Sequence, residues 1–312
     1  MHSTKLKQKQ SLKFLNTFKF EAIGTQWIID FNKEVSPTSP RLRGTGRMHS
    51  KNKLLRIIKK RIEEFEKTYS RFREDSIIYN ISQQSGTYTF PEDFSELISL
   101  YKKMYDLTDG LMTPLIGNVL EQAGYDKDYS FEKKTITTAE KWEDVLEING
   151  TTLINRKPVT LDFGAIGKGY LIDIVGKILE ENSIASYCID AGGDILVKNG
   201  EVNIGLEHPE NIKQVIGILK LDNGSICGSA GNRRKWGNMH HIINPKTLES
   251  VSGIKAVWVK AKNAALADAL TTALFFVEPE KLTEQFEFDY LIIYSDYSYK
   301  NSKLFPSELY VS

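Results

Sequence analysis

The chain is poor in cysteine, with only Cys188 and Cys227 among its 312 residues. Two thiols cannot build a disulfide framework or a four-ligand zinc site, so both kinds of stabilised small domain are excluded. Each cysteine lies in an apolar, strand-like run, which predicts a small core residue. A long apolar run is also missing. No stretch approaches the ~18 apolar residues of a transmembrane helix, so we expect no membrane span.

An excess of charge of one sign is absent as well. The chain has 41 basic and 40 acidic residues, a formal net charge of +1. Charge-driven binding to nucleic acids or acidic membranes needs a basic excess, so we expect no nucleic-acid partner. The basic N-terminus leads into no apolar signal core. We therefore expect a cytoplasmic protein, unless a leader lies outside this chain.

The order of the local patterns indicates the fold class. Residues 1–19 predict a flexible basic tail, and 20–312 one folded unit. Residues 32–51, with Arg41, Arg43 and Arg47, predict a mobile loop. Helical spacing of apolar residues then predicts helices at 53–69, 91–110 and 114–123. Asn-Gly pairs at 149–150, 199–200 and 223–224 predict hairpins. Helices followed by hairpins favour an α+β fold, with antiparallel sheets, packed helices and one compact unit, or alternatively two lobes.

The stretch 160–173 reads T-L-D-F-G-A-I-G-K-G-Y-L-I-D. It predicts a strand that ends at Phe163, a turn through three glycines, and a helix. Glycines at such a turn let backbone N–H groups approach an anion, and Lys168 adds a positive charge. Neither the P-loop nor the Rossmann spacing is present. An anion-binding turn and a plain tight turn packed on a helix both remain open.

Residues 263–277 are apolar almost all round, which is typical of a buried helix. Asp268 lies in the middle, and an ionised carboxylate there needs a partner or a metal. Thr272 lies one turn further on the same face. A carboxylate and a hydroxyl so placed suit a hard cation such as Mg²⁺. Alternatively, Asp268 caps a neighbouring backbone and Thr272 bonds back to its own helix.

Residues 225–245 form a third candidate segment, with Ser229, several cations and two histidines. Histidine can act as a general base near neutral pH. The alternatives are a surface residue for His240 and a hydrogen-bonded core residue for His241.

Taken together and in order, eight segments resemble the ApbE family of FAD:protein FMN transferases. They cover most of the chain from about Phe20 to Val277. They are G-T-Q-W at Gly24, Y-S-R-F-R-E-D-S at Tyr69, D-G-L-M-T-P at Asp109, L-D-F-G-A-I-G-K-G-Y-L-I-D at Leu161, D-A-G-G-D-I at Asp190, G-S-A-G-N-R at Gly228, H-H-I-I-N-P at His240 and A-D-A-L-T-T-A-L at Ala267.

The resemblance implies binding of FAD, cleavage of its pyrophosphate and transfer of FMN to a Ser or Thr hydroxyl of an acceptor protein, with release of AMP. It implies Mg²⁺ held by the carbonyl of Ala165, the carboxylate of Asp268 and the hydroxyl of Thr272. Asp268 and His241 would be catalytic, with His241 as the base. The implied contacts to the flavin nucleotide are Leu111, Met112, Thr113, Asp162, Lys168, Ser229 and Ile242.

The chain departs from the family pattern at two motifs. Residues 112–115 read M-T-P-L where the family commonly has F-D-P-T, so a carboxylate is missing. Asn244 replaces the Asp of H-I-I-D-P. Two other functions stay open. One is an FAD pyrophosphatase that gives FMN and AMP, and the other is a non-catalytic flavin-binding protein, which the altered 112–115 segment keeps open. Many members of the family are exported lipoproteins, yet this chain shows no lipid-attachment cysteine.

Overall fold

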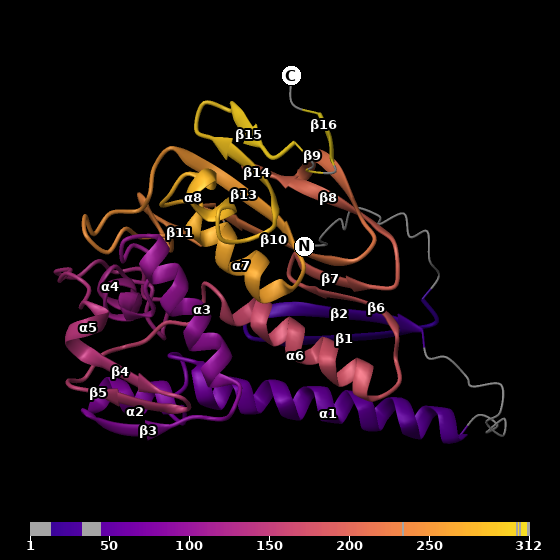
Figure 1. The fold of residues 1–312 in the computed structure, drawn as a ribbon, viewed down its shortest axis with the longest axis horizontal. Helices are drawn as coiled ribbons and strands as arrows, with labels where there is room; N and C mark the ends of the chain where they lie inside the picture. The colour runs from indigo at the N-terminus through magenta and orange to yellow at the C-terminus, as the bar shows by residue number, and fades with distance from the viewer. Residues whose placement is uncertain (1–13, 33–44, 233, 304, 306, 311–312) are drawn as a thin grey trace.

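An eight-stranded antiparallel sheet is the centre of the fold (Figure 1). The computed structural model describes residues 14–32, 45–232, 234–303, 305 and 307–310. The sheet has the order β1-β2-β6-β7-β10-β13-β14-β15. Its strands are β1 (Asn16–Ala22), β2 (Thr25–Asn32), β6 (Ser186–Ala191), β7 (Asp194–Lys198), β10 (Gly224–Ala230), β13 (Ile254–Ala261), β14 (Asp289–Tyr294) and β15 (Tyr299–Asn301).

Three smaller antiparallel sheets complete the β-structure of the described residues. The first has the order β3-β5-β4, with β3 (Gly86–Thr89), β4 (Leu146–Asn149) and β5 (Thr152–Asn155). The second has the order β16-β9-β8, with β8 (Val202–His208), β9 (Asn211–Leu221) and β16 (Ser307–Leu309). The third pairs β11 (Lys235–Trp236) with β12 (Met239–His240).

Two helices that carry predicted site residues, α6 (Gly167–Glu181) and α7 (Ala264–Ala273), pack on each other and on the large sheet. Figure 1 shows α1 (Thr45–Tyr69) running below α6, and α3 (Phe94–Leu107) between the sheet and the smaller helices. The remaining helical elements are α2 (Ile77–Gln83), η1 (Pro114–Ile116), α4 (Gly117–Gln122), α5 (Trp142–Val145) and α8 (Pro279–Thr283).

Central strands of the large sheet, such as β6 and β7, are buried on both faces. Ile189 of β6 packs into the core under α6 and α7, whereas its neighbour Cys188 packs into a second core formed with β8 and β9. The same alternation places Cys227 in the first core and Ile226 in the second. Successive strand residues point to opposite faces, so these near-continuous apolar runs fill two cores. Both cysteines are core residues, as predicted.

The predicted α+β class with antiparallel sheets in one compact unit is confirmed. The tail ends earlier than predicted, because Phe18 and Phe20 are buried in β1, which begins at Asn16. Residues 1–13 and 33–44, and with them Arg41 and Arg43, lie outside the described part. The loop prediction for 45–51 is wrong, since α1 begins at Thr45. No helix in the described ranges is long and apolar enough to cross a membrane.

Only one of the three Asn-Gly hairpins forms as predicted. Asn149 pairs with Thr152 between β4 and β5. The pairs at 199–200 and 223–224 instead connect strands of different sheets, β7 to β8 and β9 to β10. Asn199 and Gly224 both have positive φ, which such pairs adopt readily. This preference fixes a tight turn but does not decide whether the flanking strands pair with each other.

Candidate active site

The segment 158–166 is a loop that ends in a turn at 164–166, and the strand predicted to end at Phe163 is absent. The segment nevertheless buries alternate side chains, as the sequence pattern predicts: Val159, Leu161 and Phe163. Its backbone bonds to loops and helices instead of to a sheet. The Thr160 amide donates to Asn118 Oδ1 at 2.9 Å, and the Asp162 amide donates to the Pro114 carbonyl at 2.7 Å. The segment thereby lies beside the 112–115 turn.

Helices α6 and α7 cap each other's N-termini. The Asp173 carboxylate in α6 accepts from the amides of Ala264 and Ala265, at 2.9 and 2.8 Å. In return, Asp268 Oδ2 in α7 accepts from the Gly169 amide at 2.9 Å. Each carboxylate satisfies N–H groups that a helix start leaves unpaired, at the positive end of the helix dipole. The two predicted site segments are thus joined directly.

Gly169 permits this joint because the helices touch through their backbones there. A Cβ at this position would lie 2.1 Å from the Ala264 carbonyl oxygen and 2.7 Å from Asp268 Cβ. Any side chain would therefore force α6 and α7 apart. The glycine serves close helix packing, which was one of the two interpretations of the turn.

We expect Gly169→Ala to lower the free energy of unfolding by about 1–3 kcal/mol, the usual range for an overpacked contact. Gly167→Ala is the matched control two residues earlier, because its added Cβ would meet nothing closer than 3.7 Å. Urea unfolding of both variants measures the difference. Equal midpoints for the two variants would contradict the close-contact role of Gly169.

Asp268 is buried, with 5% of its surface exposed. Burial and the charge of Asp194 raise the pKa of Asp268 to about 8, against the opposing influence of Lys168 and the Gly169 amide. The alternative that Asp268 caps a neighbouring backbone is thus correct for its Oδ2, which accepts from the Gly169 amide. The residue that bonds back to its own helix is Thr271, whose hydroxyl donates to the Asp268 carbonyl at 2.7 Å. Thr272 is the neighbouring hydroxyl, half-buried and one turn from Asp268.

Lys168 lies next to this joint and pairs with Asp194, the first residue of β7. Its Nζ is 2.5 Å from Asp194 Oδ2, and the Asp194 side chain is 1% exposed. Burial lowers the pKa of Lys168, but the charges of Asp194 and Asp268 outweigh it and raise that pKa overall. The ammonium therefore stays charged at neutral pH. Sequence reasoning missed Asp194, although it stands in the D-A-G-G-D-I segment.

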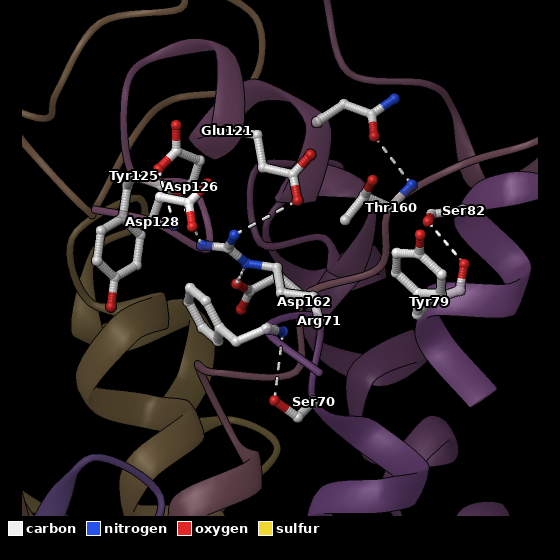
Figure 2. Close-up of polar contacts among 12 residues, drawn as sticks. Ser70, Arg71, Tyr79, Ser82, Glu121, Tyr125, Asp126, Asp128, Thr160 and Asp162 are labelled. Carbon is white, nitrogen blue, oxygen red and sulfur yellow. Dashed lines mark hydrogen bonds and ion pairs between the residues drawn. The ribbon is translucent and has the colours of Figure 1, made fainter. Parts of the chain in front are cut away.

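Asp162 pairs with a buried arginine that sequence reasoning also missed (Figure 2). Arg71 Nε donates to Asp162 Oδ2 at 2.6 Å, and Arg71 Nη2 donates to the Tyr125 carbonyl at 2.9 Å. Asp162 Oδ1 accepts from the Gly164 amide at 2.7 Å. Burial raises the pKa of Asp162, but the charge and hydrogen bond of Arg71 and the Gly164 amide lower it below the usual range. The carboxylate is therefore ionised at neutral pH.

The Arg71 guanidinium lies within a polar and aromatic cluster. Its Nη1 is 3.6 Å from Glu121 Oε1, and its centre lies 4.1 Å from the ring centroid of Phe72. Figure 2 shows Glu121 and Asp162 approaching this group from different segments. The only signal in the sequence was the arginine of Y-S-R-F, 91 residues before its partner.

The predicted contacts at 111–113 lie beside Asp162 but are largely enclosed. Met112 is 2% exposed, and Thr113 caps η1 by accepting from the Leu115 amide. Leu111 is half-buried. Contacts of these residues with a flavin nucleotide stay a prediction.

His241 is close enough to Asp162 to interact with its charge. Its amide donates to the Arg234 carbonyl at 3.3 Å, and its buried Nδ1 has no hydrogen-bond partner among the described residues. Burial, Arg234 and His240 lower the pKa of His241 to about 3, against the opposing charge of Asp162. The imidazole is therefore neutral at neutral pH and able to accept a proton.

The remaining predicted residues occupy the surroundings of this group. Ser229 Oγ in β10 is 2.9 Å from Thr271 Oγ1 in α7. Ile242 is buried in the first core. Asn244, which replaces the family's Asp, accepts from the amides of Lys246 and Thr247, a turn that Asn and Asp both form.

The described residues contain no group of three or more His, Cys, Asp or Glu side chains that could hold a metal. Any cation at the α6–α7 joint would therefore rely on one carboxylate, with hydroxyl and carbonyl oxygens. Such all-oxygen sets suit Mg²⁺ rather than zinc.

Three proteins named FAD:protein FMN transferase align with this chain. The one from Buchnera aphidicola is 25% identical over 302 residues, which are 88% of this chain and 82% of that protein. The one from Escherichia coli K12 is 22% identical over 76% of this chain and 74% of its own length. The one from Rhodobacter capsulatus is 30% identical over 185 residues, 54% of this chain but only 35% of that protein.

Solved structures share the fold. The ApbE protein of Thermotoga maritima has a TM-score of 0.74 at 21% identity and covers 94% of this chain and 99% of its own. Flavin transferase ApbE from Vibrio cholerae has a TM-score of 0.73 at 19% identity, with 95% and 97% covered. The model of the ApbE family matches residues 23–291, which include every predicted site residue. The chain therefore belongs to the ApbE family.

Proposed function

We propose that this chain transfers FMN from FAD to a Ser or Thr hydroxyl of an acceptor protein, with Mg²⁺ and with release of AMP. The family supports the reaction class, and its members named above are FAD:protein FMN transferases. The observation that carries the proposal is the α6–α7 joint. It places a buried carboxylate, a half-buried ammonium and a helix N-terminus in one group of contacts.

The residues at the joint fit Mg²⁺. Asp268 Oδ2 accepts a hydrogen bond from the Gly169 amide, and the rest of the Asp268 carboxylate would be free to hold the metal. Thr272 and the Ala165 carbonyl would add neutral oxygens, which are hard ligands of the kind that Mg²⁺ takes. Asp194 and Asp268 are both buried, with the single ammonium of Lys168 between their charges. Burial and the charge of Asp194 raise the pKa of Asp268 to about 8. A divalent cation bound beside Asp268 would lower this pKa and favour the ionised carboxylate.

Mg²⁺ supplies charge neutralisation on the pyrophosphate and its leaving group when it is bound. The chain's own residues orient the nucleotide and balance the remaining phosphate charge. Lys168 would face the phosphate charge, whereas the Gly167 and Gly169 amides at the start of α6 are already bonded to Phe163 and Asp268. The hydroxyl oxygen of the acceptor forms a bond to the phosphorus of the FMN half, and the bond from that phosphorus to the AMP oxygen breaks.

His241 takes the proton of the attacking hydroxyl in this scheme. Its neutral imidazole has an unpaired Nδ1 among the described residues, so a proton acceptor is available. An imidazole with a pKa near 3 is a weak base. A bound phosphate brings negative charge close to it and raises that pKa toward the range in which a base is effective.

The test uses FAD and MgCl₂ with the purified chain, first alone and then with candidate acceptor proteins. We expect flavin fluorescence that stays on an acceptor band after denaturing electrophoresis, a mass increase of one FMN, and one AMP per adduct. The reaction needs both Mg²⁺ and a hydroxyl, so EDTA or Ser/Thr→Ala in the acceptor should abolish the adduct.

The two other functions give different results in the same experiment. AMP and free FMN at the same rate with and without acceptor would indicate an FAD pyrophosphatase, in which water replaces the protein hydroxyl. A flavin absorbance shift on binding, without AMP in either arm, would indicate a non-catalytic flavin-binding protein. Either result would overturn the proposal of protein flavinylation.

A further inference from the structure

Lys168 lies between two buried carboxylates. Its Nζ pairs with Asp194 Oδ2 at 2.5 Å, and the charge of Asp268 acts on the same ammonium. The next residue, Gly169, donates its amide to Asp268. The backbone next to Lys168 therefore contacts Asp268, yet the Lys168 ammonium pairs with Asp194.

Asp194 is fixed independently of Lys168. It is the first residue of β7, directly after the turn that ends at Gly193, and the Gly193 amide donates to Asp190 Oδ1 at 2.9 Å. Asp194 Oδ1 accepts from the Gly228 amide of β10 at 3.2 Å. Two strands of the large sheet thus hold this carboxylate in place. The flexible partner in the pair is the lysine, whose side chain can reach more than one acceptor.

An ammonium and a metal ion compete for the same carboxylate. If Lys168 paired with Asp268, a cation at the α6–α7 joint would first have to displace that ammonium. A neighbouring opposite charge shifts the pKa of a carboxyl by about 1–3 units. Displacing the ammonium from Asp268 would cost the cation a free energy of the same order.

We propose that Asp194 is a positioning residue that holds the Lys168 ammonium away from Asp268, so that the Asp268 carboxylate stays available to a divalent cation. The inference rests on the proposed metal role of Asp268. It assigns Asp194 no contact with substrate or metal. Asp194 acts by determining whether the Lys168 ammonium pairs with Asp194 or with Asp268.

Three variants test this assignment. Asp194→Asn keeps the shape and an oxygen for the Gly228 amide, but removes the charge that retains Lys168. Lys168→Met removes the competing ammonium. The double variant Asp194→Asn/Lys168→Met removes both. Each is titrated with MgCl₂ at constant ionic strength, without FAD, and the melting temperature gives the Mg²⁺ concentration at half-maximal stabilisation. AMP release from FAD in the presence of the acceptor protein is measured in parallel.

We expect Asp194→Asn to raise the half-saturating Mg²⁺ concentration about tenfold or more, because Lys168 then pairs with Asp268. Lys168→Met should change this concentration far less than Asp194→Asn does, because Asp194 already holds the ammonium away from Asp268. The double variant should fall well below Asp194→Asn. A purely structural role for Asp194 would lower the melting temperature in all titrations without moving the half-saturation point.

An unchanged half-saturation point in Asp194→Asn, or equal values for Asp194→Asn and the double variant, would overturn the inference. If Asp194→Asn fails to fold, Asp194→Ser takes its place in the same titrations, and the same two results overturn the inference. Failure of the proposed function looks different. An unmodified chain that binds Mg²⁺ but releases no AMP would refute the transferase reaction alone, and one that does not respond to Mg²⁺ in either assay would refute both.

Discussion

Asp268→Asn is expected to reduce Mg²⁺-dependent AMP release from FAD by about 10²–10³-fold, the range for losing one charge-stabilising group in a transition state. The amide keeps the volume of the carboxylate and an oxygen for the Gly169 amide. The fold should therefore survive while the charge for the metal is lost. The rate of AMP release, measured by chromatography with the acceptor protein, at saturating FAD and across a MgCl₂ series, gives the size of the effect.

Asp173→Asn is the matched control for this change. Asp173 is the other carboxylate of the α6–α7 joint, and it caps the start of α7 through two amides. Its substitution should lower the free energy of unfolding by about 1 kcal/mol, the typical value of a helix cap, and leave the Mg²⁺ dependence of AMP release unchanged. Equal AMP release by Asp268→Asn and the unmodified chain would refute the metal role of Asp268.

The local features of this site could be predicted from the sequence. The apolar run around residue 268 marked a buried helix, and α7 is one. A buried acid inside it called for a partner, and the Gly169 amide is that partner. Such inferences hold because one helix or one turn determines them. The prediction of a strand ending at Phe163 was wrong, since alternation requires an extended backbone but does not supply a neighbouring strand.

The charge partners of the site could not be predicted, because they join segments far apart in the chain. Arg71 and Asp162 are separated by 91 residues. Lys168 lies on a helix, and Asp194 lies on a strand of the sheet that the helix covers. Each charged residue in the sequence has many possible partners, and only the packing of α6 on the sheet selects one. Pairwise charges are therefore the part of the site that required the structure.

Arg71→Met is expected to lower the free energy of unfolding by about 3–5 kcal/mol, because it leaves a buried carboxylate without its cation. The Arg71 side chain is 2% exposed and that of Asp162 13%. Arg73→Met is the matched control two residues later, where the arginine is more exposed and pairs with Asp75 and Glu63 at the surface. Surface pairs contribute about 1 kcal/mol or less. Urea unfolding compares the two variants.

The double variant Arg71→Met/Asp162→Asn separates stability from function. With neither charge left, it should recover much of the lost stability, since replacing both members of a buried pair is far less disruptive than removing one. Its AMP release should remain slower than that of the unmodified chain, because the ionised Asp162 proposed to contact the nucleotide is missing. If Arg71→Met were no less stable than Arg73→Met, the buried pair would not hold the 158–166 loop in place. If the double variant regained full activity, Asp162 would serve only the fold, and the nucleotide contact would have to come from the Lys168 side of the turn.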